Sequence, residues 1–214
     1  MRHILLMIAV VALVGCGKKG ETSQKSEPPK VVPEKLIADP IVEKEVRDKL
    51  KKYTGELTEA DLDEVEELNF WGANLTDAGL RELAKLRRLE SLGLNYTQIP
   101  GSSLGEFIKL TQLTGLSLQG TKISDTGFKE VGKLKQLILL DLSAVKVTSA
   151  NLKEVAKLNN LGTLYLDSTQ ITDAGLKEVS KLKKLSYLGL RQTTVPEASV
   201  AKLQKELPKC KIGF

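Results

Sequence analysis

Histidine is nearly absent from this sequence, and cysteine is scarce. His3 is the single histidine among 214 residues, and Cys16 and Cys210 are the two cysteines. Beyond residue 3 the chain lacks the side chain whose unperturbed pKa best suits proton transfer near neutral pH. A Ser-His-Asp or Cys-His arrangement is excluded there, and so is a zinc site of histidines and paired cysteines. We expect no catalytic residues, no metal and no cofactor.

Aromatic residues are also few, at 4% of the chain, although hydrophobic residues as a whole make up 41%. Leucine must therefore fill most of the interior. The 32 basic and 27 acidic residues are spread along the chain and leave a net charge of +5. This mixture is typical of a solvated surface and not of the basic patch that nucleic acids require. We expect no nucleic-acid partner.

The one long apolar run lies at the N-terminus, where Arg2 and His3 precede the eleven residues Ile4–Val14. At 1.5 Å per residue, such a run covers about half of a ~30 Å hydrocarbon core and is too short to span it. Its length fits the apolar region of a secretory signal. We expect residues 1–15 to be a signal peptide that is removed on export.

The apolar run ends in Leu-Val-Gly-Cys, which resembles the lipobox of bacterial lipoproteins. The resemblance implies that Cys16 becomes a lipidated N-terminus, whereas an ordinary signal cleaved nearby would leave Cys16 as a free thiol. Gly17 follows where lipoproteins of the inner membrane often carry Asp, so the pattern resembles outer-membrane sorting. Residues 16–36, rich in Lys, Glu, Ser and Pro, predict a disordered tether. If Cys16 is acylated, Cys210 is left as a lone and unreactive small residue.

Nearly the same phrase recurs every 24 residues in the second half of the chain. The stretch Leu164–Val179 reads LYLDSTQITDAGLKEV, and related phrases begin at Leu140 and Leu116. The template L-x-x-L-x-L occurs five times in register, at 89–94, 113–118, 137–142, 161–166 and 185–190. Its last two leucines are two residues apart, which is the period of a strand with one buried face. Helix signals follow each strand, as in AGLKEVSKLKKL, where Leu176, Val179 and Leu182 recur at three-residue steps.

This pattern resembles the leucine-rich repeat family, in particular bacterial members with the phrase ITDAGL. The resemblance implies an α/β fold, a right-handed leucine-rich repeat solenoid or horseshoe with a parallel concave sheet and convex helices. No single repeat can bury its leucines alone, so stacking must supply the core. A degenerate first repeat is recognised by Val65, Leu68, Phe70 and Leu75, and the shifted template reaches Phe214 at the other end. The array therefore spans 65–214, with about six repeats plus a terminal strand.

Residues 37–64 are expected to form a helical N-terminal cap on the array. Asp39 can cap a helix that has Pro40 at its first position, and we expect Gly55 to end that helix. Threonines precede the apolar residue of most repeats, where family members often carry Asn or Cys. The resemblance implies a ladder of side chains bonded to turn backbones, made by Thr97, Thr121, Thr169 and Thr193 and interrupted at Val145.

The third and fifth template positions must point away from the core, onto the concave face. They are small and polar in the N-terminal half, whereas the C-terminal half gathers Leu139, Asp141, Tyr165, Asp167, Tyr187 and Arg191. Exposed aromatics with an arginine are typical of protein-binding hot spots. The alternative is that the two tyrosines only cover a bare sheet. Trp71, in the degenerate repeat, is interpreted as packing within the cap.

Two functional interpretations follow. In the first, the chain is a non-catalytic, monomeric recognition module, held in the cell envelope by lipid on Cys16, that binds a protein or peptide on its concave face. In the second, it is a passive spacer without a specific partner. Asp141 and Asp167 lie in neighbouring repeats, whose strands are ~4.8 Å apart, so their carboxylates could approach as a glycosidase pair or calcium ligands. An open sheet and the lack of a third acidic residue argue against both.

Overall fold

The computed structural model describes residues 35–99 and 103–214. The expected signal peptide, Cys16 and all but the last two residues of the tether lie outside the described residues. In the described part, no helix combines the length and the apolar character that crossing a membrane requires.

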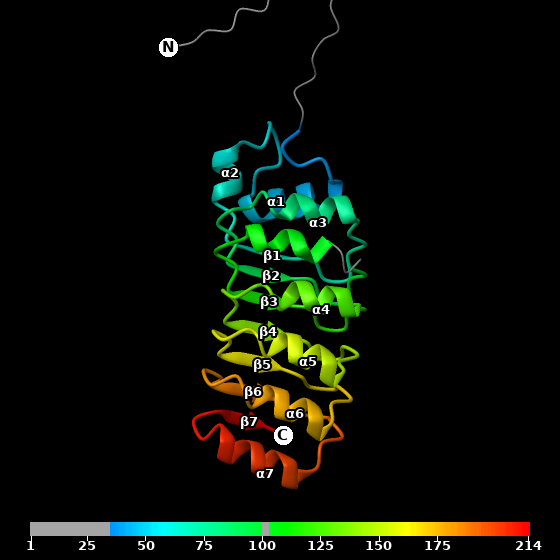
Figure 1. Cartoon of the computed structure of the whole chain (residues 1–214). Coiled ribbons are helices and arrows are strands. Elements are labelled where there is room, and N and C mark those ends of the chain that lie inside the picture. The colour runs from blue at the N-terminus through cyan, green and yellow to red at the C-terminus, as the bar shows by residue number, and fades with distance from the viewer. Residues whose placement is uncertain (1–34, 100–102) are drawn as a thin grey trace, which may run out of the picture. The chain divides into compact units, whose positions relative to one another are not determined.

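The described chain alternates between short strands and helices. Each strand has three residues and pairs in parallel with the next at a shift of 24 residues, so that Leu116 lies opposite Leu140. In Figure 1 the strands stack in chain order as the rungs of a ladder, with helices along one side. The strands are β1 (Glu67–Asn69), β2 (Ser91–Gly93), β3 (Gly115–Ser117), β4 (Leu139–Asp141), β5 (Thr163–Tyr165), β6 (Tyr187–Gly189) and β7 (Lys211–Gly213). The fold is an α/β leucine-rich repeat solenoid, as the sequence predicts.

The helices begin where the sequence places capping residues. Thr76, Ser124 and Thr148 each accept a hydrogen bond from the backbone N–H three residues later, which satisfies a donor that the first turn leaves free. Most helices of the array are short. The apolar residues Leu176, Val179 and Leu182 indicate a helix that continues through Leu182, and this expectation is wrong. That helix ends at Val179, although Leu182 is still buried in the turn that follows. The helices are α1 (Pro40–Leu50), α2 (Glu59–Asp63), α3 (Asp77–Leu83), the 3₁₀ helix η1 (Ser103–Lys109), α4 (Asp125–Val131), α5 (Ser149–Val155), α6 (Asp173–Val179) and α7 (Glu197–Glu206).

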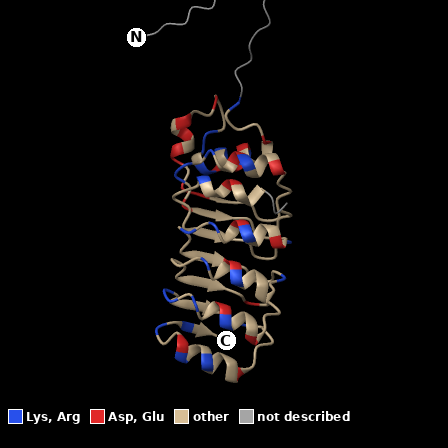
Figure 2. Cartoon of the chain, in the orientation of Figure 1, with Lys and Arg blue, Asp and Glu red and all other residues tan. Residues whose placement is uncertain are grey.

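One continuous leucine core runs between the sheet and the helices. The central residue of each inner strand, such as Leu140 or Leu164, is 0–1% exposed. The degenerate first repeat belongs to this core as predicted, since Val65, Leu68 and Phe70 are all buried. Charged residues lie mainly on the helices and turns, while most of the strand backbone in Figure 2 carries none. Burial of the leucines therefore leaves the opposite face of the sheet open for other roles.

The threonine ladder is present and is interrupted at the predicted position. The hydroxyls of Thr97, Thr121, Thr169 and Thr193 donate to the carbonyl three residues earlier, at 2.5–2.7 Å. Val145 is equally buried but can make only the backbone bond to Leu142, at 3.2 Å. One turn therefore lacks the side-chain bond that its neighbours have.

Helix α1 is capped by Asp39, whose carboxylate accepts from the N–H groups of Ile41 and Val42 at 2.9 and 3.1 Å. Val42 and Val46 are fully buried beneath it. The expected end at Gly55 is wrong, because α1 ends at Leu50. Lys51 adopts a left-handed conformation there, and its N–H bonds back to carbonyls of the last turn. An αL residue at this place is the usual way to end a helix, but glycine is not obligatory for it.

Candidate functional site

The concave face, defined here as the face of the sheet opposite the helices, carries the first and third residues of each strand. In β4 these are Leu139, which is 36% exposed, and Asp141, while the central Leu140 is fully buried. The same alternation holds in β2, β3 and β5. The sequence pattern therefore assigned the correct residues to this face.

Tyr165 and Tyr187 lie side by side on the C-terminal half of the concave face. Their ring centroids are 5.3 Å apart and the rings are tilted by 51°. Each ring also covers a glycine of the next strand. A Cβ on Gly189 would stand 3.1 Å from the Tyr165 ring, and one on Gly213 would stand 2.9 Å from the Tyr187 hydroxyl. The pair is thus both a partly exposed aromatic surface and a cover for two bare backbone positions.

The two aspartates of this half hold backbone groups. Asp141 accepts from the N–H of Ser143 at 2.8 Å, and Asp167 accepts from the N–H of Arg191 at 2.7 Å. The second bond joins one repeat to the next. Within the described residues no group of three His, Cys, Asp or Glu could hold a metal ion. Asp141 also accepts from the Ser117 hydroxyl at 3.4 Å, so both carboxylates bond to neighbouring protein groups.

The six candidate residues extend over three neighbouring strands, β4 to β6, and the turns that follow them. Tyr165, Tyr187 and Arg191 come together at the last repeats, and within the described part the Arg191 guanidinium forms no ion pair. Leu139 lies two strands from Tyr187, with Thr163 between them in the same row. A partner that contacted both Leu139 and Tyr187 would have to cross three strands.

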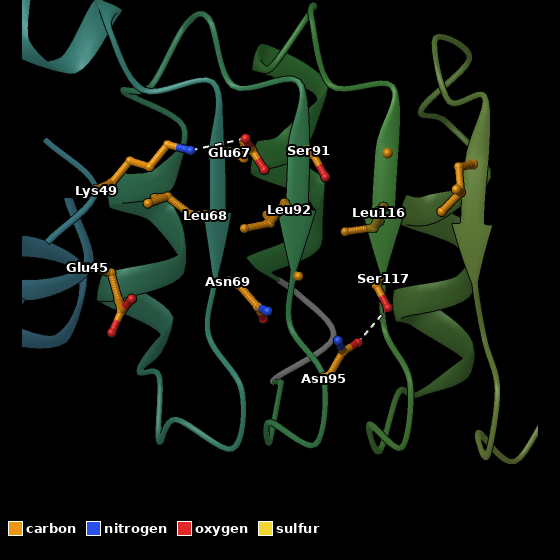
Figure 3. A pocket seen from close by; sticks show the side chains of 13 residues that line it. Glu45, Lys49, Glu67, Leu68, Asn69, Ser91, Leu92, Asn95, Leu116 and Ser117 are labelled. Carbon is orange, nitrogen blue, oxygen red and sulfur yellow. Dashed lines mark hydrogen bonds and ion pairs between the residues drawn. The ribbon is translucent and has the colours of Figure 1, made fainter.

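A hollow of about 430 Å³ lies on the N-terminal half of the concave face, where the sequence predicted no site. Figure 3 shows Lys49 of α1 reaching Glu67 at one end, with Asn69, Asn95 and Ser117 along the strand ends. Its other lining residues are Glu45, Leu68, Ser91, Leu92, Gly93, Gly115, Leu116 and Leu139. The sequence feature that indicates this hollow is the set of Ser, Gly and Asn residues at successive concave positions. Their small side chains leave space above the sheet.

The interpretation of Trp71 as cap packing is wrong. Its side chain is 63% exposed and stacks against Tyr96 of the next repeat, with ring centroids 4.8 Å apart. Tyr96 is itself 47% exposed and lies over Gly120, where an added Cβ would stand 2.5 Å from the ring. Phe70, the preceding residue, is 1% exposed, and Trp71 points the other way because successive side chains of an extended segment alternate between faces.

Cys210 immediately precedes β7 and is 3% exposed. Burial raises the pKa of its thiol, which lowers the fraction present as reactive thiolate. This environment agrees with the expectation that Cys210 serves as a small packing residue.

The sequence matches no protein-family model and no curated protein. Solved structures share the fold at low identity. Internalin C2 from Listeria monocytogenes is 22% identical, with a TM-score of 0.58 and 83% of each chain covered. An internalin (inlF) from the same species is 16% identical with a TM-score of 0.52, covering 84% of this chain and 63% of that one. A Leptospira interrogans LRR protein is 24% identical with a TM-score of 0.47, covering 72% of this chain and 50% of that one.

Proposed function

We propose that this protein is a non-catalytic recognition module that binds a protein or peptide through the C-terminal half of its concave face. The observation that carries the proposal is the adjacent pair Tyr165 and Tyr187, which the leucine template does not require. Aromatic anchors of this kind contribute a large share of the free energy of association. The shared fold with two internalins supports a solenoid architecture, and the tyrosine pair supplies the argument for binding.

The second part of the proposal is export and attachment to the cell envelope, at the outer membrane, by lipid on Cys16. It rests on the sequence Leu-Val-Gly-Cys after an eleven-residue apolar run. Burial of acyl chains contributes ~0.8 kcal/mol per methylene, and stable anchoring requires more than one chain. Cys16→Ala should release the protein from membranes or leave its precursor uncleaved. Unchanged membrane association without fatty acid on the mature chain would contradict lipid attachment.

Binding can be tested by crosslinking in envelope preparations, followed by mass spectrometry and affinity measurement with the purified partner. Replacing Tyr165 and Tyr187 together by Ala should weaken binding by at least ~2 kcal/mol, or roughly thirtyfold. Arg191→Glu should act mainly on the association rate and its salt dependence. Lys177→Ala, on the helix side, is the matched control and should leave affinity unchanged. A captured partner that binds the double tyrosine variant as tightly as the wild type would exclude this surface.

A passive spacer is the second candidate, because both tyrosines also cover glycines and both aspartates hold turns. Under that function the concave face completes the array and has no ligand. The two candidates differ in one outcome: a spacer yields no partner that loses affinity when the tyrosines are replaced.

A further inference from the structure

The rim aromatic pair, Trp71 and Tyr96, lies at the surface of the array, where the Tyr96 ring also covers Gly120. Both rings are about half exposed or more, and neither contributes to the buried core. Tyr96 also has φ 55°, a left-handed conformation that costs free energy for a residue with a Cβ. The equivalent positions one repeat before and after are Gly72 and Gly120, at φ 64° and 66°. A large ring therefore stands where the neighbouring repeats have glycine.

Trp71 occupies the same position in its repeat as Asn95, which lines the hollow, although neither ring of the pair lines the hollow itself. The hollow offers neutral hydrogen-bonding groups that the described protein leaves unused. The amide of Asn69 and the hydroxyl of Ser91 both line it and make no hydrogen bond to another described residue. Asn95 uses its Oδ1, which accepts from Ser117 Oγ at 2.5 Å and from the N–H of Gln119 at 3.2 Å. Its Nδ2 remains available as a donor. These groups can both donate and accept, at positions one strand apart.

The charges around the hollow are confined to the end next to α1. Lys49 is paired with Glu67 at 3.1 Å, and the remaining carboxylate, Glu45, lies 3.5 Å from Lys44. The floor and the strand-end rim carry no charge. Among the described residues that line the hollow, no cation is left unpaired to select an anionic ligand. Leu68, Leu92 and Leu116 in its floor are buried, so they offer little apolar surface to the anchoring side chain of a peptide.

We propose that the hollow and the rim aromatic pair together form a binding site for a neutral glycan. Sugar hydroxyls both donate and accept, which matches the amides and hydroxyls of Asn69, Ser91 and Asn95. The C–H face of a pyranose ring is apolar and slightly positive, so it packs on the negative face of an aromatic ring. Trp71 stands two residues after Asn69, on the same face of the chain, and its ring stacks on Tyr96, which places the aromatic rim next to the polar floor. The volume of about 430 Å³ lies within the range of small-molecule sites.

The site lies in the opposite half of the concave face from the tyrosine pair, and the inference does not rest on the proposed protein-binding function. Its lining comes from α1, the first three strands, Asn95 and Leu139 of β4, whereas Tyr165 and Tyr187 lie on β5 and β6. Both tyrosines can therefore be replaced without altering a residue that lines the hollow.

Trp71 is the only tryptophan of the chain, so its fluorescence reports directly on the rim aromatic pair. The purified protein, kept free of sugar-based detergents, should be titrated with cellotetraose and with tetra-N-acetylchitotetraose. We expect a saturable change in Trp71 emission with at least one of them, and the same affinity by calorimetry. An uncharged, end-blocked tetrapeptide serves as the competing ligand class and should produce no saturable change.

Tyr96→Gly is the decisive variant, because it removes the ring and gives the left-handed position the residue that its neighbours have. The variant should fold at least as well as the wild type, with sugar affinity lowered at least about tenfold, equivalent to 1.4 kcal/mol. Asn69→Ala should also lower the affinity for the sugar. Ala144→Gly, at the same backbone position two repeats later and also at φ 56° in the wild type, is the matched control.

Three outcomes would overturn the inference. The first is the absence of saturable binding with both sugars. The second is unchanged sugar affinity in a folded Tyr96→Gly variant, and the third is tighter binding of the tetrapeptide than of either sugar. Replacement of Tyr165 and Tyr187 should leave sugar binding intact, so failure of the protein-binding proposal and failure of this one are distinguishable.

Discussion

The two halves of the concave face share one backbone but use their side chains differently. In the C-terminal half, Tyr165 and Tyr187 cover glycines, and Asp167 bonds the backbone of the next repeat. In the N-terminal half, Asn69 and Ser91 also stand over glycines of the next strand, but their polar groups line an open hollow and make no hydrogen bond to another described residue. A repeat array fixes where a side chain points, and the side chain's own size and bonds decide whether it completes the array or remains free for a ligand.

The comparison is informative because some positions do serve the same purpose in both halves. Asn95 and Asp167 occupy equivalent positions three repeats apart, and each accepts from the backbone N–H 24 residues later. Their side chains continue the hydrogen bonding between repeats beyond the ends of the strands. The difference between the halves therefore lies in the strand residues themselves and in the rim aromatic pair.

The largest effect is expected from separating the halves at β4. Leu140 is fully buried at the centre of the array, so Leu140→Ala should lower the free energy of unfolding by ~2–5 kcal/mol. Each repeat contacts only its neighbours, so the variant should also uncouple the two halves and broaden the unfolding transition. Chemical denaturation followed by circular dichroism measures both effects.

The adjacent Leu139 provides the control, because it is 36% exposed on the concave face. Leu139→Ala should change the unfolding free energy by no more than ~0.5 kcal/mol, the usual range for surface substitutions. Equal losses for the two variants would mean that the strand register is wrong.

A smaller effect is expected where a side chain joins repeats. Asp167→Ala removes the acceptor for the Arg191 N–H and should cost about 1 kcal/mol, less than a buried charged hydrogen bond because water can reach the site. Asp167→Asn keeps an acceptor oxygen and should recover most of the loss in thermal unfolding. If Asp167→Ala and Lys177→Ala have the same stability, the bond between repeats contributes nothing measurable.

The sequence was sufficient for the solenoid because its signal repeats. Five copies of the leucine template in one register identify the central residue of each strand, and the assignment of each repeat is supported by the same pattern in the next. The same reasoning misplaced the end of α1 and the length of α6, since helix ends depend on single residues such as Lys51. The period of the repeat does not predict the exact residue at which a helix ends.

The candidate site was only partly predictable for a related reason. The template shows that Tyr165 and Tyr187 point to the concave face from adjacent strands, which is enough to place their rings near each other. It does not show that Asp167 bonds a backbone N–H or that Trp71 leaves the cap to stack on Tyr96. These contacts depend on side-chain rotamers and on turn geometry, for which the repeat sets no pattern. The hollow was missed because it is defined by small side chains.

The smallest expected effects concern the threonine ladder, which differs between repeats by a single hydroxyl. Thr121→Val should destabilise the protein by roughly 0.5–1 kcal/mol, since Thr121 is buried and its hydroxyl donates to Leu118 at 2.6 Å. The loss is limited because the backbone N–H of Thr121 also donates to that carbonyl, at 3.1 Å. The reverse change, Val145→Thr, places a hydroxyl near the Leu142 carbonyl and should change stability by less than ~0.5 kcal/mol. The gained bond is offset by burying a polar group where a methyl now packs. Thermal unfolding of the two variants, measured side by side, gives the difference. A larger loss of stability for Val145→Thr than for Thr121→Val would show that the turn after β4 has a distinct geometry.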